Sequence, residues 1–557
     1  MRFLIVLLVA FMFVTCKNGA DVTSTNEQNT VKAPFTWENA TIYFMMTDRF
    51  NNGDKSNDFT HSEEAPPAAY RGFMGGDVKG ITQKINEGYF NDLGVDAIWM
   101  TPLVEQIQGS VDEGTGMSYP FHGYWTRDWT AIDKRFGTAA EVKEMVQTAH
   151  AHGIRILMDA VANHTGPVTQ ESPVWPTDWV RTGPQCTYQG AESTISCTLV
   201  ENLPDIRTDS DKEVKLPKFL AEKWKAENRY EQEVKELDEF FEKTGYKRTP
   251  VNYIIKWIVD LIKDYGIDGY RVDTVKHTES KVWADLYKAA LEAYEIMKKE
   301  HPEMVIEDNE FYMVGEVYNY YIGNGRLYDY NDKLVDFYKD GYKALINFDL
   351  KTSAANSYEA VFSRYDSILH TDMVGKSVVN YMSSHDDGSP YDKMRERPFE
   401  AMTRLFLTPG AVQLYYGDES ARRLDVEAKG DAVLRSFMNW DEIKDNTVRN
   451  EHKVKEVLAH TQNLANFRKR HPAIGAGRHS MISESPYFFS RKYKIQNFED
   501  MVVIGIDIPE GKVKVDVSSV FEDGTVVNEV YSGSRAEVKN GQLEVSEHSG
   551  IILLERG

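Results

Sequence analysis

The chain is 557 residues long, which is enough to bury a large core and predicts more than one domain. Its hydrophobic content of 41% and charged content of 27% are those of an ordinary globular protein. The formal net charge of -22 argues against nucleic acid or an anionic membrane surface as partner, because acidic side chains outnumber Lys and Arg.

The N-terminus has the pattern of an export signal. Arg2 is followed by an apolar run from Phe3 to Val14 that is too short to span a membrane, and Cys16 closes it. This resembles a bacterial lipoprotein signal, in which the cysteine becomes the lipidated first residue. We therefore expect a signal peptide over residues 1–16, a tether over 17–35, and a periplasmic or cell-surface lipoprotein. Ordinary cleavage near Cys16, which releases a free protein, is the alternative.

Two further cysteines, Cys186 and Cys197, lie close together in the sequence. In an exported chain such a pair is expected to form one disulfide that closes a short loop.

Short apolar runs of strand length alternate with segments of helical spacing. This alternation predicts a parallel sheet with crossover helices, although periodicity alone leaves a doubly wound sheet possible. The predicted strands are Ile42–Met46, Ala97–Met100, Ile154–Ala160, Gly269–Val272, Tyr312–Val317, Val378–Met382 and Val412–Tyr416. The predicted helices are Val78–Asn91, Ala139–His152, Val251–Tyr265 and Ser280–Lys299.

Polar residues follow these strands directly, among them Asn163, Asp273, Glu316 and Asp386. Such placement is typical of the C-terminal mouth of a (β/α) barrel, where enzymes of that fold keep their chemistry. The connection after His164 is too long for a structureless loop and predicts a small inserted domain. The tail changes to alternating apolar runs, which predict an antiparallel β domain. The predicted domains are 36–164 and 251–474 for the barrel, 165–250 for the insertion and 475–557 for the β domain.

Four segments together resemble the α-amylase family, family 13 of the glycoside hydrolases. A fifth, Leu203-Pro-Asp-Ile206, falls inside the long connection, where the family has a short motif of similar form. The resemblance implies a (β/α)8 barrel, an inserted domain after the third strand and a C-terminal antiparallel β-sandwich. The four segments are Asp159-Ala-Val-Ala-Asn-His164, Gly269-Tyr-Arg-Val-Asp-Thr-Val-Lys-His277, Gly315-Glu-Val317 and Ser383-Ser-His-Asp386.

The resemblance implies that Asp273 is a nucleophile and Glu316 a general acid/base, as a retaining glycosidase requires. Arg271 stands two residues before Asp273 on one predicted strand, so both side chains should point the same way. Its guanidinium would then keep Asp273 ionised. Asp386 matches the family's third carboxylate, which grips sugar hydroxyls. Taken singly, Asp273 could instead be part of a structural Arg–Asp pair.

Five further residues match substrate contacts of the family. His122 and His385 match histidines that bond hydroxyls of the cleaved sugar, and Tyr124 would stack on that sugar. Lys276 and His277 match residues that line the leaving-group side. A core aromatic for Tyr124 and a solvated loop charge for Lys276 are the plainer interpretations.

Calcium is the cofactor that the resemblance implies, in a structural role, because carboxylate, amide and backbone oxygens suit this cation. Asn163, Asp205 and the backbone carbonyl of His277 match a site between barrel and insertion. A second candidate resembles a calcium loop after the first strand, although runs of Asn, Gly and Asp are often plain turns. Its residues are Asn52, Asp54, Asn57, Asp58, Gly75 and Asp77.

The function that this resemblance implies is hydrolysis of internal α-1,4 bonds of starch or maltodextrin. Family members that cleave cyclomaltodextrins or pullulan usually carry an extra N-terminal β domain, whereas the first strand here is expected near Ile42. Transfer of glucan chains uses the same three carboxylates and stays open. A non-catalytic starch-binding lipoprotein is the alternative from another class, and the sequence leaves the oligomeric state undetermined.

Overall fold

The computed structural model describes residues 33–307 and 309–557. The predicted signal peptide and residues 17–32 of the predicted tether lie outside this part of the chain. Within the described part, no helix is both long and apolar enough to cross a membrane.

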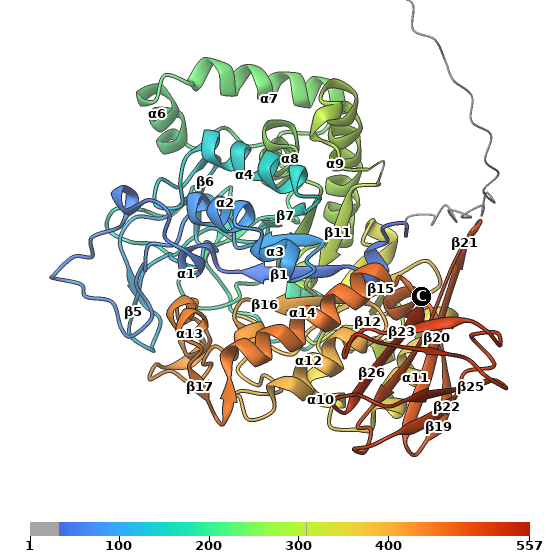
Figure 1. Ribbon diagram of the computed structural model, residues 1–557. Coiled ribbons are helices and arrows are strands. Elements are labelled where there is room, and N and C mark those ends of the chain that lie inside the picture. The colour runs from blue at the N-terminus through green and yellow to red at the C-terminus, as the bar shows by residue number, and fades with distance from the viewer. Residues whose placement is uncertain (1–32, 308) are drawn as a thin grey trace, which may run out of the picture.

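The centre of the molecule is a closed barrel of eight parallel strands (Figure 1). Every strand is buried along its whole length, which explains why the strands read as nearly continuous apolar runs rather than as alternating ones. Closure is made by the first and last strands, whose residues Thr41 and Val412 are paired. In order around the barrel the strands are β1 (Thr41–Met45), β2 (Ala97–Met100), β7 (Arg155–Ala160), β10 (Gly269–Val272), β11 (Tyr312–Gly315), β14 (Ala344–Asn347), β15 (Ser377–Asn380) and β16 (Ala411–Tyr415).

The seven predicted strands are confirmed, and the eighth, β14, was missed. It contains only four residues, Ala344–Asn347, and is followed by a helix of similar length, α10 (Leu350–Ser353). A strand this short does not show a pattern of apolar residues that distinguishes it from the sequence around it. Only the pairing of Ala344 with β11 and β15 identifies it as a barrel strand.

The helices that cover the barrel begin and end at recognisable signals. Helix α4 starts with a capping box, in which Thr138 and Glu141 each bond the other's backbone N–H. Helix α8 begins with Pro250 and ends at Gly266, whose φ of 73° favours glycine. The principal covering helices are α2 (Val78–Asn86), α4 (Ala139–Ala151), α8 (Pro250–Tyr265), α9 (Ser280–Glu300), α11 (Tyr358–Thr371), α12 (Pro398–Leu407) and α14 (Val454–Arg470).

One predicted helix and one charged stretch of the insertion are each divided into two helices. The segment 78–91 contains α2 and a separate short α3 (Tyr89–Asp92), because Gly88 between them has a φ of 80°. The charged stretch Lys212–Lys243 becomes α6 (Lys218–Ala226) and α7 (Tyr230–Thr244), with Asn228 at a φ of 59° between them. A residue with positive φ cannot continue a right-handed helix, so each break follows from one residue.

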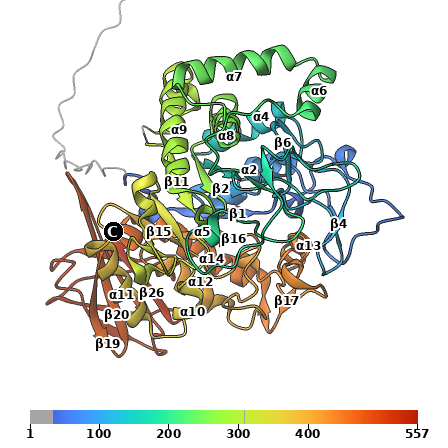
Figure 2. The same ribbon diagram turned by 180° about the vertical axis from the view of Figure 1, so that it is seen from behind.

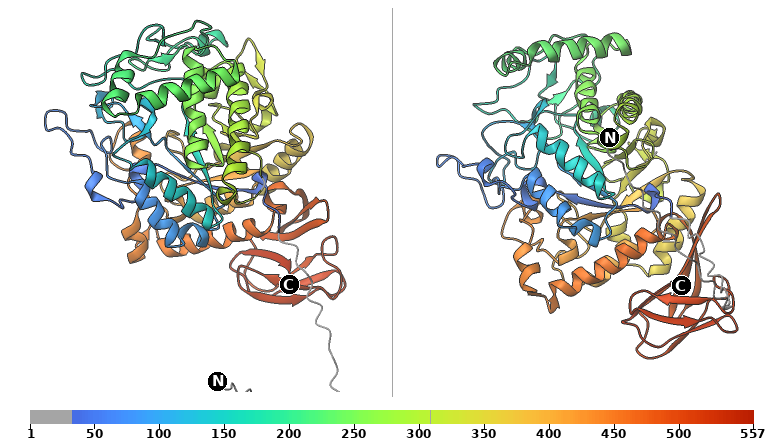
Figure 3. Two further views of the ribbon diagram at one scale, coloured as in Figure 1. Left: turned by 90° about the horizontal axis from the view of Figure 1, so that it is seen from above. Right: turned by 45° about the horizontal axis from the view of Figure 1, so that its top comes forward.

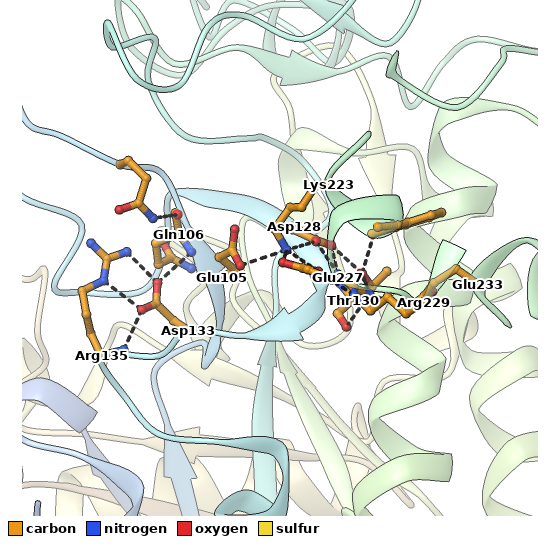
Figure 4. A network of polar contacts seen from close by, with 12 residues as sticks. Glu105, Gln106, Asp128, Thr130, Asp133, Arg135, Lys223, Glu227, Arg229 and Glu233 are labelled. Carbon is orange, nitrogen blue, oxygen red and sulfur yellow. Dashed lines mark hydrogen bonds and ion pairs between the residues drawn. The ribbon is translucent and has the colours of Figure 1, made fainter. Parts of the chain in front are cut away.

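A polar network attaches α6 and α7 to β6 (Thr126–Ile132), which pairs with β3 (Val104–Gln106) outside the closed barrel, as Figure 4 shows. The buried carboxylate of Asp128 accepts hydrogen bonds from Lys223 Nζ at 2.8 Å and Arg229 Nη2 at 2.9 Å. Arg229 and Trp224 also donate to the hydroxyl of Thr130, at 2.7 and 3.1 Å. Although burial opposes ionisation, the two cations keep the pKa of Asp128 below its usual value. The insertion is thus held to the barrel by charge as well as by apolar packing.

The C-terminal part consists of two antiparallel sheets that enclose their own apolar core (Figures 2 and 3). Phe488, Val503 and Val515 belong to this core. It lies beside α11 and α14, on the side of the barrel away from α6 and α7. One sheet has the order β19 (Arg478–Glu484), β20 (Tyr487–Ile495), β21 (Phe498–Ile506), β26 (Ile551–Arg556), β23 (Val526–Glu529) and β24 (Ser534–Glu537), and the other pairs β22 (Val513–Asp516) with β25 (Gln542–Val545).

Replacement of Asp128 tests whether this network holds the inserted helices. Asp128→Ala leaves Lys223 and Arg229 without their shared buried partner, so we expect the protein to lose about 3 kcal/mol of stability. Limited proteolysis within α6–α7 should accelerate, and the melting temperature should fall. Lys235→Ala is the control, because its ion pair with Glu239 is at 3.6 Å and 75% of the lysine side chain is exposed; it should change stability by less than about 1 kcal/mol. Equal effects of the two variants would contradict this assignment.

Candidate active site

Three carboxylates predicted from the sequence lie beyond the carboxyl ends of three barrel strands, of which two are neighbours. Asp273 follows β10, Glu316 follows β11 and Asp386 follows β15. The backbone N–H of Asp273 donates to the carbonyl of Ala160 on the adjacent strand, and that of Glu316 donates to Val272. The sheet therefore carries both residues to the same rim of the barrel, as expected from parallel pairing.

Arg271 joins the carboxylates into one cluster. Its Nη1 lies 2.5 Å from Asp273 Oδ1, and its Nη2 lies 3.5 Å from Glu316 Oε2. The guanidinium is 2% exposed, so its charge interacts with these groups almost without screening by water. The prediction that Arg271 and Asp273 point to the same side is confirmed, and the two acid groups share one cation.

The environment of Glu316 favours its protonated form. Burial raises the pKa of this carboxyl, and the negative charges of Asp273 and Asp386 raise it further, against the opposing effect of Arg271. Its Oε2 accepts a hydrogen bond from the backbone N–H of Thr274 at 2.9 Å, which fixes the orientation of the group. A carboxyl that keeps its proton in this way can act as an acid near neutral pH.

Asp386 differs from its neighbour Asp387. Asp387 is held by Lys351 and accepts a hydrogen bond from the hydroxyl of Tyr381 at 2.6 Å. Asp386 leaves 37% of its side chain exposed and lies 3.6 Å from His385 Nδ1. Of the two carboxylates, Asp386 is therefore the one available to a ligand in the cleft.

Three rings predicted to contact the substrate form one row. The ring of Tyr124 is nearly parallel to that of His385, with centroids 5.3 Å apart, and to that of His122, at 5.9 Å. Burial lowers the pKa values of both histidines well below the usual range, so both are neutral. The Nδ1 of His122 accepts the backbone N–H of Tyr124, which places the histidine's proton on Nε2.

Lys276 and His277 lie in a short turn after β10, spanning Val275–His277. Both are buried, at 8% and 4% exposure. Lys276 Nζ donates to the carbonyl of Tyr318 at 3.3 Å, and Tyr318 is two residues beyond Glu316. The structure thus places Lys276 beside the acid group, and burial lowers its pKa.

The first predicted metal set is brought together between barrel and insertion. Asn163 donates to Asp205 Oδ2 at 3.2 Å, and Thr278, the residue after His277, donates to Asn163 Oδ1 at 3.3 Å. Oδ1 of Asp205 is buried without a hydrogen-bond partner, and burial raises the pKa of this carboxyl to about 8. An unpartnered buried carboxylate oxygen of this kind fits a cation.

The second predicted metal set divides into two groups. Asn52 donates to Asp58 Oδ1 at 2.7 Å, and the amide oxygens of Asn52 and Asn57 are buried without partners. Gly75 lies against them, because a Cβ there would come within 2.5 Å of both Asn52 and Asp58.

The other two residues of this set have protein partners. Asp54 pairs with Lys79 at 2.8 Å, and Asp77 accepts the backbone N–H of Asp54 and that of Gly80 in the first turn of α2. In the described part of the chain, no cluster of three or more His, Cys, Asp or Glu could hold a metal ion.

Two residues with central positions were not predicted to have a role. Asp159, at the end of β7, accepts hydrogen bonds from Tyr124 at 2.7 Å, Arg271 at 3.0 Å and Trp99 at 3.1 Å. It is the first residue of one of the motifs on which the family resemblance rests, so the sequence did contain a signal for its role. Arg435 donates to the carbonyl of His385 at 2.9 Å, and nothing in the sequence around it distinguishes it from a surface arginine.

Comparisons with known proteins agree with this geometry. Residues 44–477 match the model of the α-amylase catalytic domain. The periplasmic α-amylase of Escherichia coli is 34% identical over 523 residues, which cover 83% of this chain and 71% of that enzyme. A cyclomaltodextrin glucanotransferase of Thermoanaerobacterium thermosulfurigenes is 26% identical over 81% of this chain and 58% of its own length. The crystal structure of an Anoxybacillus α-amylase has the same fold, with a TM-score of 0.63, 22% identity and coverage of 94% of this chain and 99% of that one.

The chain belongs to the α-amylase family of glycoside hydrolases, and it is a glycosidase with a (β/α)8 barrel.

The protonation of Glu316 can be observed directly. An infrared difference spectrum between wild type and Glu316→Gln at pH 6 should contain the band of a protonated carboxyl, because pH 6 is well above the ordinary glutamate value of 4.5. In an Asp386→Asn background the same band should disappear at lower pH, since a negative charge that disfavours ionisation has been removed. The absence of a protonated carboxyl band at pH 6 would show that Glu316 is already ionised.

Proposed function

We propose that this chain is an exported, retaining α-amylase that hydrolyses internal α-1,4-glucosidic bonds of starch or maltodextrin. The observation that carries the proposal is the contact of one buried guanidinium, that of Arg271, with both Asp273 and Glu316. Asp273, in contact with this guanidinium, is placed to attack, and Glu316, whose pKa is raised by burial and by neighbouring negative charges, is suited to donate a proton.

The proposed roles follow from these environments. Asp273, held by Arg271, attacks the anomeric carbon and forms a covalent glycosyl–enzyme bond. Glu316 gives its proton to the leaving glycosidic oxygen, and the resulting carboxylate then takes a proton from the water that breaks the covalent bond. Asp386 holds sugar hydroxyls in the cleft. His122 and His385 bond hydroxyls of the cleaved sugar, Tyr124 supplies an aromatic face to it, and Lys276 and His277 line the leaving-group side.

Transfer of the glucosyl group to a sugar is the second candidate, because a cyclomaltodextrin glucanotransferase is among the relatives. In a transferase an acceptor hydroxyl replaces water in the second step, with the same carboxylates. Product analysis on maltoheptaose distinguishes the two, since hydrolysis alone gives only chains shorter than the substrate, whereas transfer also gives longer or cyclic ones.

Calcium is proposed as a structural cation at both predicted sets of oxygens. At the first, Asn163, Asp205 and the carbonyl of His277 would provide ligands, and the unpartnered Oδ1 of Asp205 supports this. At the second, the free amide oxygens of Asn52 and Asn57 support a site with Asp58 and Gly75. A cation at the first site would connect the insertion to the strand end that carries Asp273.

Export is supported by the N-terminal pattern and by the similarity to a periplasmic relative. We propose that the mature protein reaches the periplasm or the cell surface, held by a lipid on Cys16.

Replacement of the two acid groups tests the assignment of roles. Asp273→Asn and Glu316→Gln should each reduce kcat on soluble starch by several orders of magnitude, because one removes the attacking charge and the other the transferable proton. Circular dichroism should be unchanged, since both replacements have nearly the same size. Azide should restore part of the Glu316→Gln activity only on substrates with a good leaving group. Retained activity of Asp273→Asn would show that the nucleophile is elsewhere.

Removal of calcium should lower the melting temperature. A cation at a hundredfold excess over its Kd stabilises the native state by about 2.7 kcal/mol, and excess chelator removes this contribution. Asp205→Asn should weaken the response at the first site, and Asp58→Asn should weaken it at the second. A melting temperature that does not change in excess chelator would exclude structural calcium at both sites.

A further inference from the structure

One buried carboxylate holds both ends of the segment that carries Asp386. We call this segment, residues 383–395, the β15 loop, because it begins shortly after that strand. Asp418 lies in a short turn after β16 and is 1% exposed. Its Oδ2 accepts a hydrogen bond from the hydroxyl of Ser383 at 2.6 Å, and its Oδ1 accepts one from Nη2 of Arg395 at 2.5 Å. The first and last residues of the β15 loop therefore meet at a single side chain.

The contacts of Asp418 are of the strong kind. Hydrogen bonds to an ionised carboxylate are shorter and stronger than those between neutral groups. Asp418 and Arg395 leave only 1% and 4% of their side chains exposed, so water competes little for their charges. The hydroxyl of Ser383 thus has a fixed acceptor at the point where the chain leaves the barrel.

The backbone of Arg395 has a conformation that its surroundings must impose. Its φ of 58° lies in the left-handed region, which is unfavourable for a residue with a large side chain. Besides the bond to Asp418, its guanidinium donates through Nε to the carbonyl of Arg422 at 2.7 Å. The segment after β16 therefore holds the end of the β15 loop through two contacts with one side chain.

The carboxylate of Asp386 depends on the loop for its position. In the part of the chain that the structure describes, its polar contacts are to the hydroxyl of Ser384 at 3.4 Å and to Nδ1 of His385 at 3.6 Å. Both partners belong to the β15 loop itself. Outside contacts therefore act on Asp386 through the backbone, as that of Arg435 with the carbonyl of His385 does.

We propose that Asp418, Arg395 and Ser383 are positioning residues that place the carboxylate of Asp386 in the cleft. All three are buried behind the loop, so their effect on the reaction passes through Asp386. This inference rests on the proposed function, because it requires Asp386 to hold sugar hydroxyls while the bond is broken. Misplacement of a binding group by about 1 Å can reduce a rate by about a hundredfold.

Ser383→Ala tests the attachment at the start of the loop. It removes one hydroxyl and leaves the ion pair of Asp418 with Arg395 in place. We expect kcat/KM for 2-chloro-4-nitrophenyl maltotrioside to fall by about tenfold, because Asp386 is less well placed. Ser377→Ala is the matched control, since Ser377 is buried at the other end of β15 and its hydroxyl donates only to the carbonyl of Val378. It should change kcat/KM by less than about twofold.

A double-mutant cycle with Asp386→Ala separates positioning from a general loss of structure. In the Asp386→Ala background, Ser383→Ala should change kcat/KM by less than about twofold, because the carboxylate that it positions is absent. A general structural defect would instead lower kcat/KM by the same factor in both backgrounds.

The ion pair is tested by Arg395→Gly, since glycine adopts a positive φ without strain and only the side chain is lost. The variant should lose at least about tenfold in kcat/KM when assayed below its melting temperature. It should also melt at a lower temperature, because Asp418 keeps a buried charge without its cation. In the double variant Arg395→Gly/Asp418→Asn this charge is removed as well, so the melting temperature should recover in part while kcat/KM stays low.

The possible results lead to different conclusions. If Ser383→Ala has the same effect in both backgrounds, or has no effect in the wild-type background, Asp418 does not position Asp386. If the double variant recovers kcat/KM together with its melting temperature, the ion pair has only a structural role and the assignment of Arg395 is wrong. If Arg395→Gly does not fold, the cycle with Ser383 decides the proposal. A wild-type protein that is inactive on both the maltotrioside and soluble starch overturns the proposed function itself.

Discussion

The buried guanidinium of Arg271 is the interaction on which the active site depends. Three carboxylates, those of Asp159, Asp273 and Glu316, contact this one cation. Burial raises the pKa of Glu316, and the negative charges of Asp273 and Asp386 raise it further, against the opposing effect of Arg271. Asp273 Oδ1 lies 2.5 Å from the guanidinium, and Glu316 Oε2 lies 3.5 Å from it. The guanidinium thus holds the proposed nucleophile and the proposed acid at one rim of the barrel.

Asp159 extends this constraint to the substrate-facing side of the cleft. It accepts hydrogen bonds from Arg271, Trp99 and Tyr124, which come from three different segments of the barrel. The tyrosine ring that is proposed to stack on the sugar is thus oriented by the same network that contacts Asp273. Arg271, Trp99 and Asp159 are on barrel strands in a packed core, so small displacements of this network are resisted by the barrel.

The insertion contributes to the site in two ways. Its helices α6 and α7 are attached to the barrel through Asp128, away from the carboxylates. Its disulfide loop, closed by the predicted Cys186–Cys197 pair, instead contacts His277 in the turn that follows Asp273. Asp205 accepts a hydrogen bond from Asn163, which follows β7. The C-terminal sheets pack on α11 and α14 and contribute no residue to the cluster described above.

The sequence by itself determined the strand–helix alternation, seven of the eight barrel strands, the family and the identity of the three carboxylates. These follow from local patterns, because burial sets the periodicity of apolar residues and the chemistry requires particular residue types at strand ends. The closure of the barrel, the eighth strand β14 and the shared contacts of Asp159 were decided only by the tertiary structure. Each of them depends on which residues that are far apart in the sequence come into contact in the folded protein. The spacing of residues along the chain does not show which of these contacts form.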